Sequence, residues 1–219
     1  MAKTPYVHEQ DLQQMFKIAA VSAGQPVRNV AMLRVIYGTG MTLQEIARVP
    51  VKSYLRIDGK ILEESVITSD IAFNASERPL YWTNSILVMA IEAYLALRIE
   101  NRQMVTTCKM AYRGLDPDSP IFLTDEGAPY KLTKRPTKGG EICYSCDSLS
   151  QLFRKLHAQA GIEGASATSG RRTCAVRLSK QGGSLKQIKT LLGLKSIQAA
   201  RALADIDEIH LGTIAARVF

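Results

Sequence analysis

The sequence has few cysteines, few aromatic residues and no long apolar run. Four cysteines in 219 residues are too few for a disulfide-stabilised scaffold, and only 6% of the residues are aromatic. No apolar stretch reaches the ~20 residues that cross a bilayer, and the first residues lack the apolar core of a signal peptide. We therefore expect neither export nor membrane insertion, and we place the protein in a reducing, bacterial-type cytoplasm.

Acidic residues are also scarce relative to basic ones, with 20 Asp and Glu against 28 Lys and Arg. The formal net charge is +8 at pH 7, and the isoelectric point is about 9.4. Such an excess favours a polyanionic partner, nucleic acid first, although a solubilising surface would produce the same excess. The apolar fraction of 46% is ordinary for a folded protein, and the length fits one large domain or two small ones.

Hydrophobic periodicity predicts helices along most of the chain. The predicted helices cover residues 8–22, 27–37, 42–47, 84–101, 148–160, 170–181, 184–192 and 197–203. Thr42 with Glu45, and Ser148 with Gln151, fit the capping-box pattern that opens a helix.

Extended segments follow the third predicted helix. Residues 54–57, 64–67 and 78–82 are the strand candidates, with Asp58-Gly59 as a hairpin turn after the first. Residues 112–147 are rich in Gly and Pro and are predicted to be loop, apart from a short strand at 121–124. Helices, a small sheet and further helices predict an α+β fold that is mostly α, with a three-stranded antiparallel sheet.

The most specific motifs lie in the C-terminal third. Residues 169–178 read SGRRTCAVRL, and residues 191–197 read LLGLKSI. They resemble the signature of the tyrosine recombinase (phage integrase) family, H-x-x-R-R-T-F-A-x-x-L followed by L-L-G-H-x-S-I and, nine residues past the second histidine, a nucleophilic tyrosine. Residues 37–46, 120–123 and 152–162 resemble further family motifs, so the likeness extends over about residues 5–207.

The resemblance implies a tyrosine-recombinase catalytic-domain fold. It predicts that residues 1–219 form one such domain, without the N-terminal helical domain that relatives use to clamp DNA from the other side.

The resemblance also implies which positions would carry the chemistry, and most hold other residues. Arg171 matches one of the two arginines that hold the scissile phosphate. The other arginine, the lysine, the two histidines and the tyrosine fall on Thr42, Asn74, Thr168, Leu194 and Leu203. Leucine has no heteroatom to attack a phosphate, and losing one preorganised donor typically costs on the order of 100- to 1000-fold in rate. We therefore predict a pseudo-enzyme, unless a partner supplies residues in trans.

Candidate DNA contacts fall into three groups. The basic loop is either a phosphate-binding segment or solvated surface, and its cations are Lys131, Lys134, Arg135 and Lys138. The following helix offers side chains that can bond phosphates or base edges, namely Ser148, Ser150, Gln151, Arg154 and Lys155. By family position Arg171 and Arg172 are phosphate candidates, and the alternative for Arg172 is a buried structural ion pair.

Two further features carry weaker expectations. Cys143 and Cys146 form a CxxC pair without a second ligand pair at suitable spacing, so we expect no metal and no cofactor. Residues 209–219 have apolar residues near helical spacing. This C-terminal helix or tail would dock on a second copy or a partner recombinase, or pack on its own core.

Three functions remain open from the sequence. The first is a double-stranded DNA-binding, non-catalytic recombinase-like protein, associated with the nucleoid, that acts in regulation or as an accessory to recombination and integration on a mobile element. The second is a divergent site-specific recombinase that needs a partner for catalysis. The third is a protein-interaction module that does not bind DNA.

Overall fold

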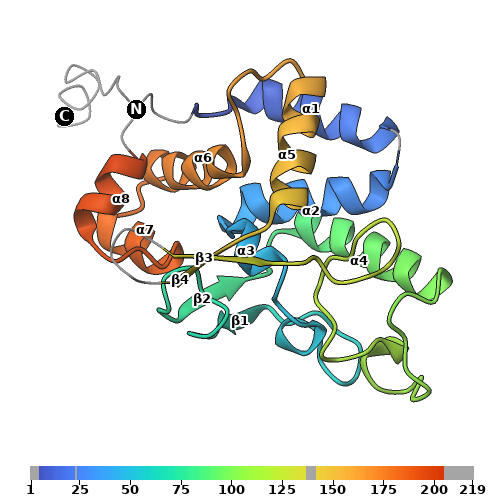
Figure 1. Ribbon diagram of the computed structural model, residues 1–219. Helices are drawn as coiled ribbons and strands as arrows, with labels where there is room; N and C mark the ends of the chain where they lie inside the picture. The colour runs from blue at the N-terminus through green and yellow to red at the C-terminus, as the bar shows by residue number, and fades with distance from the viewer. Residues whose placement is uncertain (1–4, 23, 137–141, 205–219) are drawn as a thin grey trace.

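The computed structural model describes residues 5–22, 24–136 and 142–204, and its elements are shown in Figure 1. The helices are α1 (Glu9–Val21), α2 (Pro26–Thr39), α3 (Leu43–Ile46), α4 (Ser85–Glu100), α5 (Asp147–Gln159), α6 (Ala167–Lys180), α7 (Leu185–Leu191) and α8 (Ile197–Ala204), with 3-10 turns at Val51–Ser53 and Tyr112–Gly114. The strands are β1 (Glu64–Ile67), β2 (Arg78–Tyr81), β3 (Thr133–Pro136) and β4 (Ile142–Ser145). The mostly α, α+β class predicted from the sequence is confirmed.

Helix α2 forms the centre of the main core. It packs against α1, α4 and α6 (Figure 1). Apolar side chains buried on it include Met32, Leu33 and Ile36. A smaller second core joins α6, α7 and α8 through buried residues such as Ile188 and Ala200. Helix α6 connects the two cores, because it packs against α2 as well as against α7 and α8.

The close approach of α6 to α2 depends on Gly170. A Cβ atom at this position would lie 2.1 Å from Cγ2 of the buried Ile36, well inside contact distance. We expect Gly170→Ala to lower the free energy of unfolding by about 1–3 kcal/mol because the core must shift to admit a methyl group. Helix propensity alone predicts that the same change raises the free energy of unfolding by about 0.5–1 kcal/mol. The sign of the change in urea denaturation therefore shows whether the steric clash or the helix propensity dominates. A stabilised variant would show that α2 and α6 are less tightly packed.

The predicted three-stranded sheet is wrong in its strand count. β1 pairs with β2 and β3 with β4, both antiparallel, in two separate two-stranded sheets. The expected strand at 54–57 makes one isolated bridge, Leu55 to Ile61, because the chain turns at once through Gly59 at φ +83°. The expected strand at 121–124 likewise makes a single bridge, Leu123 to Pro129. β3 and β4 lie in the segment predicted as loop.

One of the two predicted capping boxes is confirmed. Thr42 Oγ1 accepts a hydrogen bond from the Glu45 backbone N–H at 3.3 Å, and the Glu45 carboxylate accepts one from the Thr42 N–H at 2.8 Å. The box at Ser148 is wrong: α5 begins at Asp147 after Cys146, which makes no side-chain cap bond. The predicted tail at 209–219 lies outside the described residues. Across the described part of the chain, no helix has the length and apolar character needed to span a membrane.

Candidate functional site

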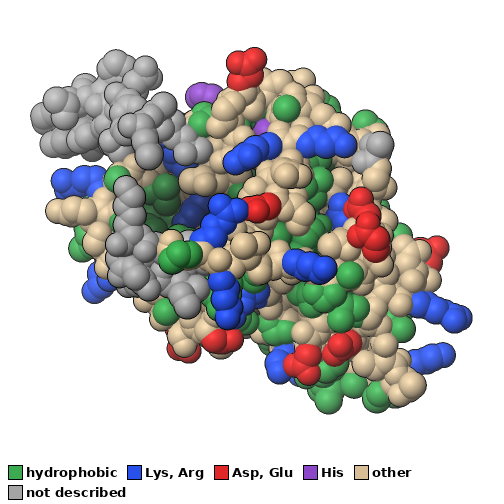
Figure 2. All heavy atoms as spheres, in the orientation of Figure 1, with side chains coloured by type: hydrophobic (Ala, Val, Ile, Leu, Met, Phe, Trp, Pro, Cys, Tyr) green, Lys and Arg blue, Asp and Glu red, His purple; other side chains and the backbone are tan. Residues whose placement is uncertain are grey.

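The resemblance assigns six positions to the family's chemistry, and five of them line one cavity of about 620 Å³. It lies where the N-terminal end of α6 meets α3, β4 and α8. Its lining includes Thr42, Thr168, Arg171, Leu194 and Leu203. In Figure 2 a hollow with hydrophobic side chains on its walls opens beside α6 and α8. Residues that are up to 161 positions apart in the sequence therefore share one surface.

The sixth position lies in an adjoining cavity of about 870 Å³. Asn74, in the connection between β1 and β2, lines it together with Arg171 and Leu194. The Asn74 side-chain amide donates a hydrogen bond to the Gly193 carbonyl, which ties this connection to the turn after α7. Arg171 lines both cavities, and each of the other five positions lines at least one of them.

Arg171 is held by backbone carbonyl groups. Its guanidinium donates to the Gly40 carbonyl at 2.9 Å and to the Leu192 carbonyl, and the side chain is partly exposed on the cavity wall. Burial lowers the pKa of Arg171 to about 10, so the group is still positively charged at neutral pH. Two of its five N–H donors are used in these bonds. The arrangement presents a rigid cation to the cavity.

A buried ion pair lies behind Arg171. Glu45 and Arg78 join at 2.9 Å, and their side chains are 2% and 1% exposed. The Glu45 carboxylate also accepts the backbone N–H groups of Thr42 and Phe73. Burial by itself would raise the pKa of Glu45, but the charge and hydrogen bond of Arg78, the Thr42 N–H and the charge of Arg171 outweigh burial and lower it.

Sequence reasoning missed the role of Arg78. Its guanidinium also donates to the Leu191 carbonyl at 2.7 Å, so one side chain links β2, α3 and the end of α7. Gly193 packs against it: a Cβ there would lie 2.7 Å from Arg78 Cδ, and its φ of +57° favours glycine. The available signal was an arginine at the inward-facing start of a strand. A buried arginine favours a buried acid as its partner. Glu45 is the acid of the capping-box motif, so it was a candidate for that partner.

Leu194 and Leu203 pack on the second core. Both are partly buried against the cluster that includes Leu192 and Ala204. Among the described residues that line the 620 Å³ cavity, Arg171 is the one charged side chain and Tyr144 the one phenol. Of the positions that the resemblance assigns to the chemistry, those other than Arg171 present apolar or hydroxyl side chains to this cavity.

The predicted DNA contacts divide between this cavity and a neighbouring surface. Ser150 lines the cavity. Lys131, Lys134, Ser148, Gln151, Arg154 and Lys155 are exposed on the segment from 131 to 134 and on α5. Figure 2 shows Lys and Arg side chains over this part of the molecule. We call Lys131, Lys134, Arg154 and Lys155 the basic surface.

Three predicted contacts have other surroundings. Arg135 is exposed but forms an ion pair with Asp147 at 2.9 Å. Arg172 is only 8% exposed, which favours a buried structural role over a phosphate contact. Lys138 lies outside the described residues. Cys146 is buried, and the part of the chain that the structure describes contains no group of three or more potential metal-ligating residues.

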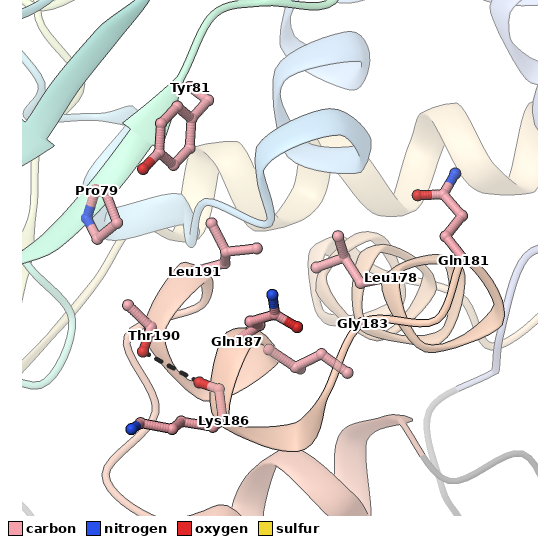
Figure 3. A pocket seen from close by; sticks show the side chains of 10 residues that line it. Pro79, Tyr81, Leu178, Gln181, Gly183, Lys186, Gln187, Thr190 and Leu191 are labelled. Atoms are coloured by element: carbon pink, nitrogen blue, oxygen red, sulfur yellow. Dashed lines mark hydrogen bonds between the residues drawn. The ribbon is translucent and has the colours of Figure 1, made fainter.

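A separate cavity of about 530 Å³ lies between β2 and α6–α7. Figure 3 shows Tyr81 and Pro79 on one side and Leu178, Gln187 and Leu191 on the other. None of the predicted site residues lines it. We therefore assign the candidate site to the cavity at Arg171 and the basic surface.

Comparison with known proteins confirms the resemblance at the level of the fold. No family model matches the chain. The tyrosine recombinase XerC of Bacillus pumilus (strain SAFR-032) is 24% identical over 207 residues, which cover 94% of this chain and 58% of that protein. The chain thus spans about three fifths of the length of this curated relative.

Solved structures show the same fold over nearly the whole chain. XerA recombinase superimposes with a TM-score of 0.69 at 18% identity, covering 99% of this chain and 66% of that one. XerH recombinase bound to palindromic difH substrate gives 0.68 at 16% identity, with coverages of 99% and 53%. The catalytic domain of bacteriophage HP1 integrase gives 0.55 at 13% identity, with coverages of 99% and 96%. The chain has the catalytic-domain fold of the tyrosine recombinases.

Proposed function

We propose that this chain binds duplex DNA without cleaving it, as an accessory to DNA recombination and integration or as a regulator on a mobile element. The observation that carries the proposal is the composition of the cavity at Arg171. One phosphate-binding cation remains there, and leucines stand where the fold family places a histidine and the nucleophile. A site of this kind can hold a phosphate but lacks the groups for strand transfer.

Affinity for DNA is attributed to the basic surface together with Arg171. Exposed cations that contact phosphates release counterions and give sequence-independent affinity. Exposed Gln151 and Ser148 on α5 are of types that bond phosphates or base edges. The Tn1549 transposon integrase, which shares the fold, was solved in complex with transposon right end DNA. We extend that partner to this chain as part of the proposal.

The absence of cleavage follows from the groups around Arg171. Strand transfer needs a nucleophile, stabilisation of the phosphoryl charge and a proton for the leaving oxygen. Leu203 supplies no nucleophile and Leu194 no proton. Arg171 is left as the one cation that would stabilise the charge on the phosphoryl group, and hydrogen bonds to the Gly40 and Leu192 carbonyls hold it in place.

A suicide substrate, a nicked duplex on which a covalent protein–DNA intermediate is trapped, tests both DNA binding and the absence of cleavage in one sample. We expect a shifted band on a native gel and no protein–DNA adduct on a denaturing gel. A covalent adduct would refute the non-catalytic role, whereas absence of the shift at low salt would refute DNA binding.

Restoring the tyrosine alone is not expected to restore cleavage. In Leu203→Tyr a phenol would enter the cavity, but Thr42, Thr168 and Leu194 still lack the cation and proton donors. The expected yield of covalent adduct stays at the background of the unaltered protein, with Leu203→Phe as the matched control of size. Adduct formed by the Tyr variant and not by the Phe variant would show that Arg171 suffices for catalysis.

One observation favours the second function, a divergent recombinase. Tyr144 on β4 lines both cavities at Arg171, so a phenol is present near the remaining cation. Its ring contacts the Arg48 guanidinium at 5.4 Å from the ring centroid. If this function were correct with Tyr144 as the nucleophile, the adduct of this chain on the suicide duplex would form with a partner recombinase present and disappear in Tyr144→Phe. Adduct that persists in Tyr144→Phe would assign the nucleophile to the partner.

The proposal includes the organisation of the chain. We propose that residues 1–219 act as one recombinase-like domain on the nucleoid and that 209–219 docks on a second copy or a partner recombinase. Two linked copies would bind DNA with an avidity above that of one. Sedimentation with and without duplex DNA tests docking on a second copy, and a monomer under both conditions would contradict it.

A further inference from the structure

The cavity at Arg171 combines one fixed cation with an apolar wall. Apolar side chains from four parts of the chain contribute to that wall, among them Met41, Phe73, Leu194, Ala199 and Leu203. Its volume of about 620 Å³ lies within the range of sites for small organic ligands, roughly 300–1,000 Å³. A DNA phosphate would contact Arg171 but would leave the apolar wall uncovered.

The electrostatics of the cavity select an anion. Arg171 is the one charged residue among the described residues of the lining, and the nearby carboxylate of Glu45 is 2% exposed and bonded to Arg78. The two carbonyls that hold Arg171 accept from Nη1 and Nη2, one bond each. A guanidinium has five N–H donors in a planar fork that suits a carboxylate.

We infer that this cavity is a binding site for a small amphipathic carboxylate, with the carboxylate on Arg171 and an apolar chain or ring against Leu194, Leu203 and Phe73. The hydroxyls of Thr42 and Thr168 also line the cavity and can bond the second carboxylate oxygen or its water. A fully polar anion would leave the apolar wall exposed to water. A neutral apolar molecule would remove water from the guanidinium without supplying an anion to balance its charge.

Binding of such a ligand would oppose binding of DNA, because a carboxylate and a phosphate would use the same guanidinium. This consequence rests on the proposed function, whereas the ligand site itself does not. The site is therefore tested first without DNA.

The test uses decanoate as the probe and isothermal titration calorimetry of the full chain. We expect a single site and an affinity at least tenfold higher for decanoate than for decanol or for butyrate. Equal affinity for decanoate and decanol would overturn the role of Arg171. Equal affinity for decanoate and butyrate would overturn the apolar wall, and no binding of decanoate would overturn the site.

Substitutions locate the site without altering Arg171, whose carbonyl contacts support the fold. Thr168 is exposed on the cavity wall, one turn of α6 before Arg171. Thr168→Glu is expected to weaken decanoate binding at least tenfold by placing a negative charge beside the guanidinium. Gln181→Glu adds the same charge just after the other end of α6, at an exposed position, and is expected to leave affinity unchanged. Equal affinity of the two variants would place the ligand elsewhere.

Competition is measured separately with a fluorescent duplex. If decanoate binds and DNA binds, decanoate should release the DNA from the unaltered protein, whereas decanol at the same concentration should not. Failure of the duplex to bind would refute the proposed function and leave the calorimetric result standing. Binding of both without competition would overturn the shared use of Arg171.

Discussion

Arg78→Met is expected to lower the free energy of unfolding by about 3–5 kcal/mol, because it leaves a buried carboxylate without its partner. Glu45 is 2% exposed, and Arg78 is the cation that pairs with it. Met fills a similar volume, so the loss comes mainly from the unpaired carboxylate, with a smaller part from the Leu191 carbonyl that loses its donor. Urea denaturation at pH 7 measures it. A loss below about 1 kcal/mol, the usual range of an exposed pair, would contradict the buried pair.

The pH dependence of the same variant separates charge from packing. In the unaltered protein the pKa of Glu45 lies below its ordinary value of 4.5, so its contribution is present above that pH and lost as the pH falls through the lowered pKa. Without Arg78 the pKa of Glu45 rises, because burial is then opposed by the weaker effects of the Thr42 N–H and the charge of Arg171. Ionisation of Glu45 then costs stability, and protonation at lower pH relieves the cost. The destabilisation should therefore shrink as the pH falls toward 4. The double variant Arg78→Met, Glu45→Gln should recover part of the loss at pH 7, and an equal loss at both pH values would indicate packing alone.

Neutralising the basic surface should produce the largest change in DNA affinity. Changing Lys131, Lys134, Arg154 and Lys155 together to Gln removes four exposed cations. If all four contact phosphates, the slope of log K against log salt should flatten by about 3–4, and affinity at 0.1 M salt should fall on the order of 1,000-fold. Fluorescence anisotropy of a labelled duplex over a salt series measures both quantities.

A matched control variant has the same net charge as the variant above but keeps the basic surface intact. The control changes four cations in the loops at 56–60 and 102–109 to Gln, and they are Arg56, Lys60, Arg102 and Lys109, all exposed. We expect the control to retain the slope of the unaltered protein within about one unit. Equal losses in both variants would show that net charge, and not the basic surface, determines binding.

The helices were predictable from the sequence because their signals are local. Apolar spacing located α1, α2 and α4, and the reciprocal bonds of Thr42 and Glu45 follow from two residues three positions apart. The sheets were harder because strand pairing depends on distant residues. Thr133–Pro136 pairs with Ile142–Ser145 across a segment rich in Gly and Pro, a composition that is typical of loops.

The grouping of the site was predictable only through the family resemblance. The motifs indicate six positions, and the structure places all six on the two adjoining cavities that Arg171 lines. No local pattern could have shown that Arg172 points into the interior while Arg171 reaches the cavity, because the two differ only by their place on α6. The pair of Glu45 with Arg78 and the entry of Tyr144 into the cavity likewise result from tertiary packing.

The most direct test of the account is the affinity of the unaltered protein for a labelled random duplex, measured by anisotropy from low to physiological salt. The account predicts binding at low salt, with log K falling linearly against log salt by several units per decade. Absence of binding at the lowest salt, or an affinity that does not change with salt, would contradict it and favour a role in protein interaction.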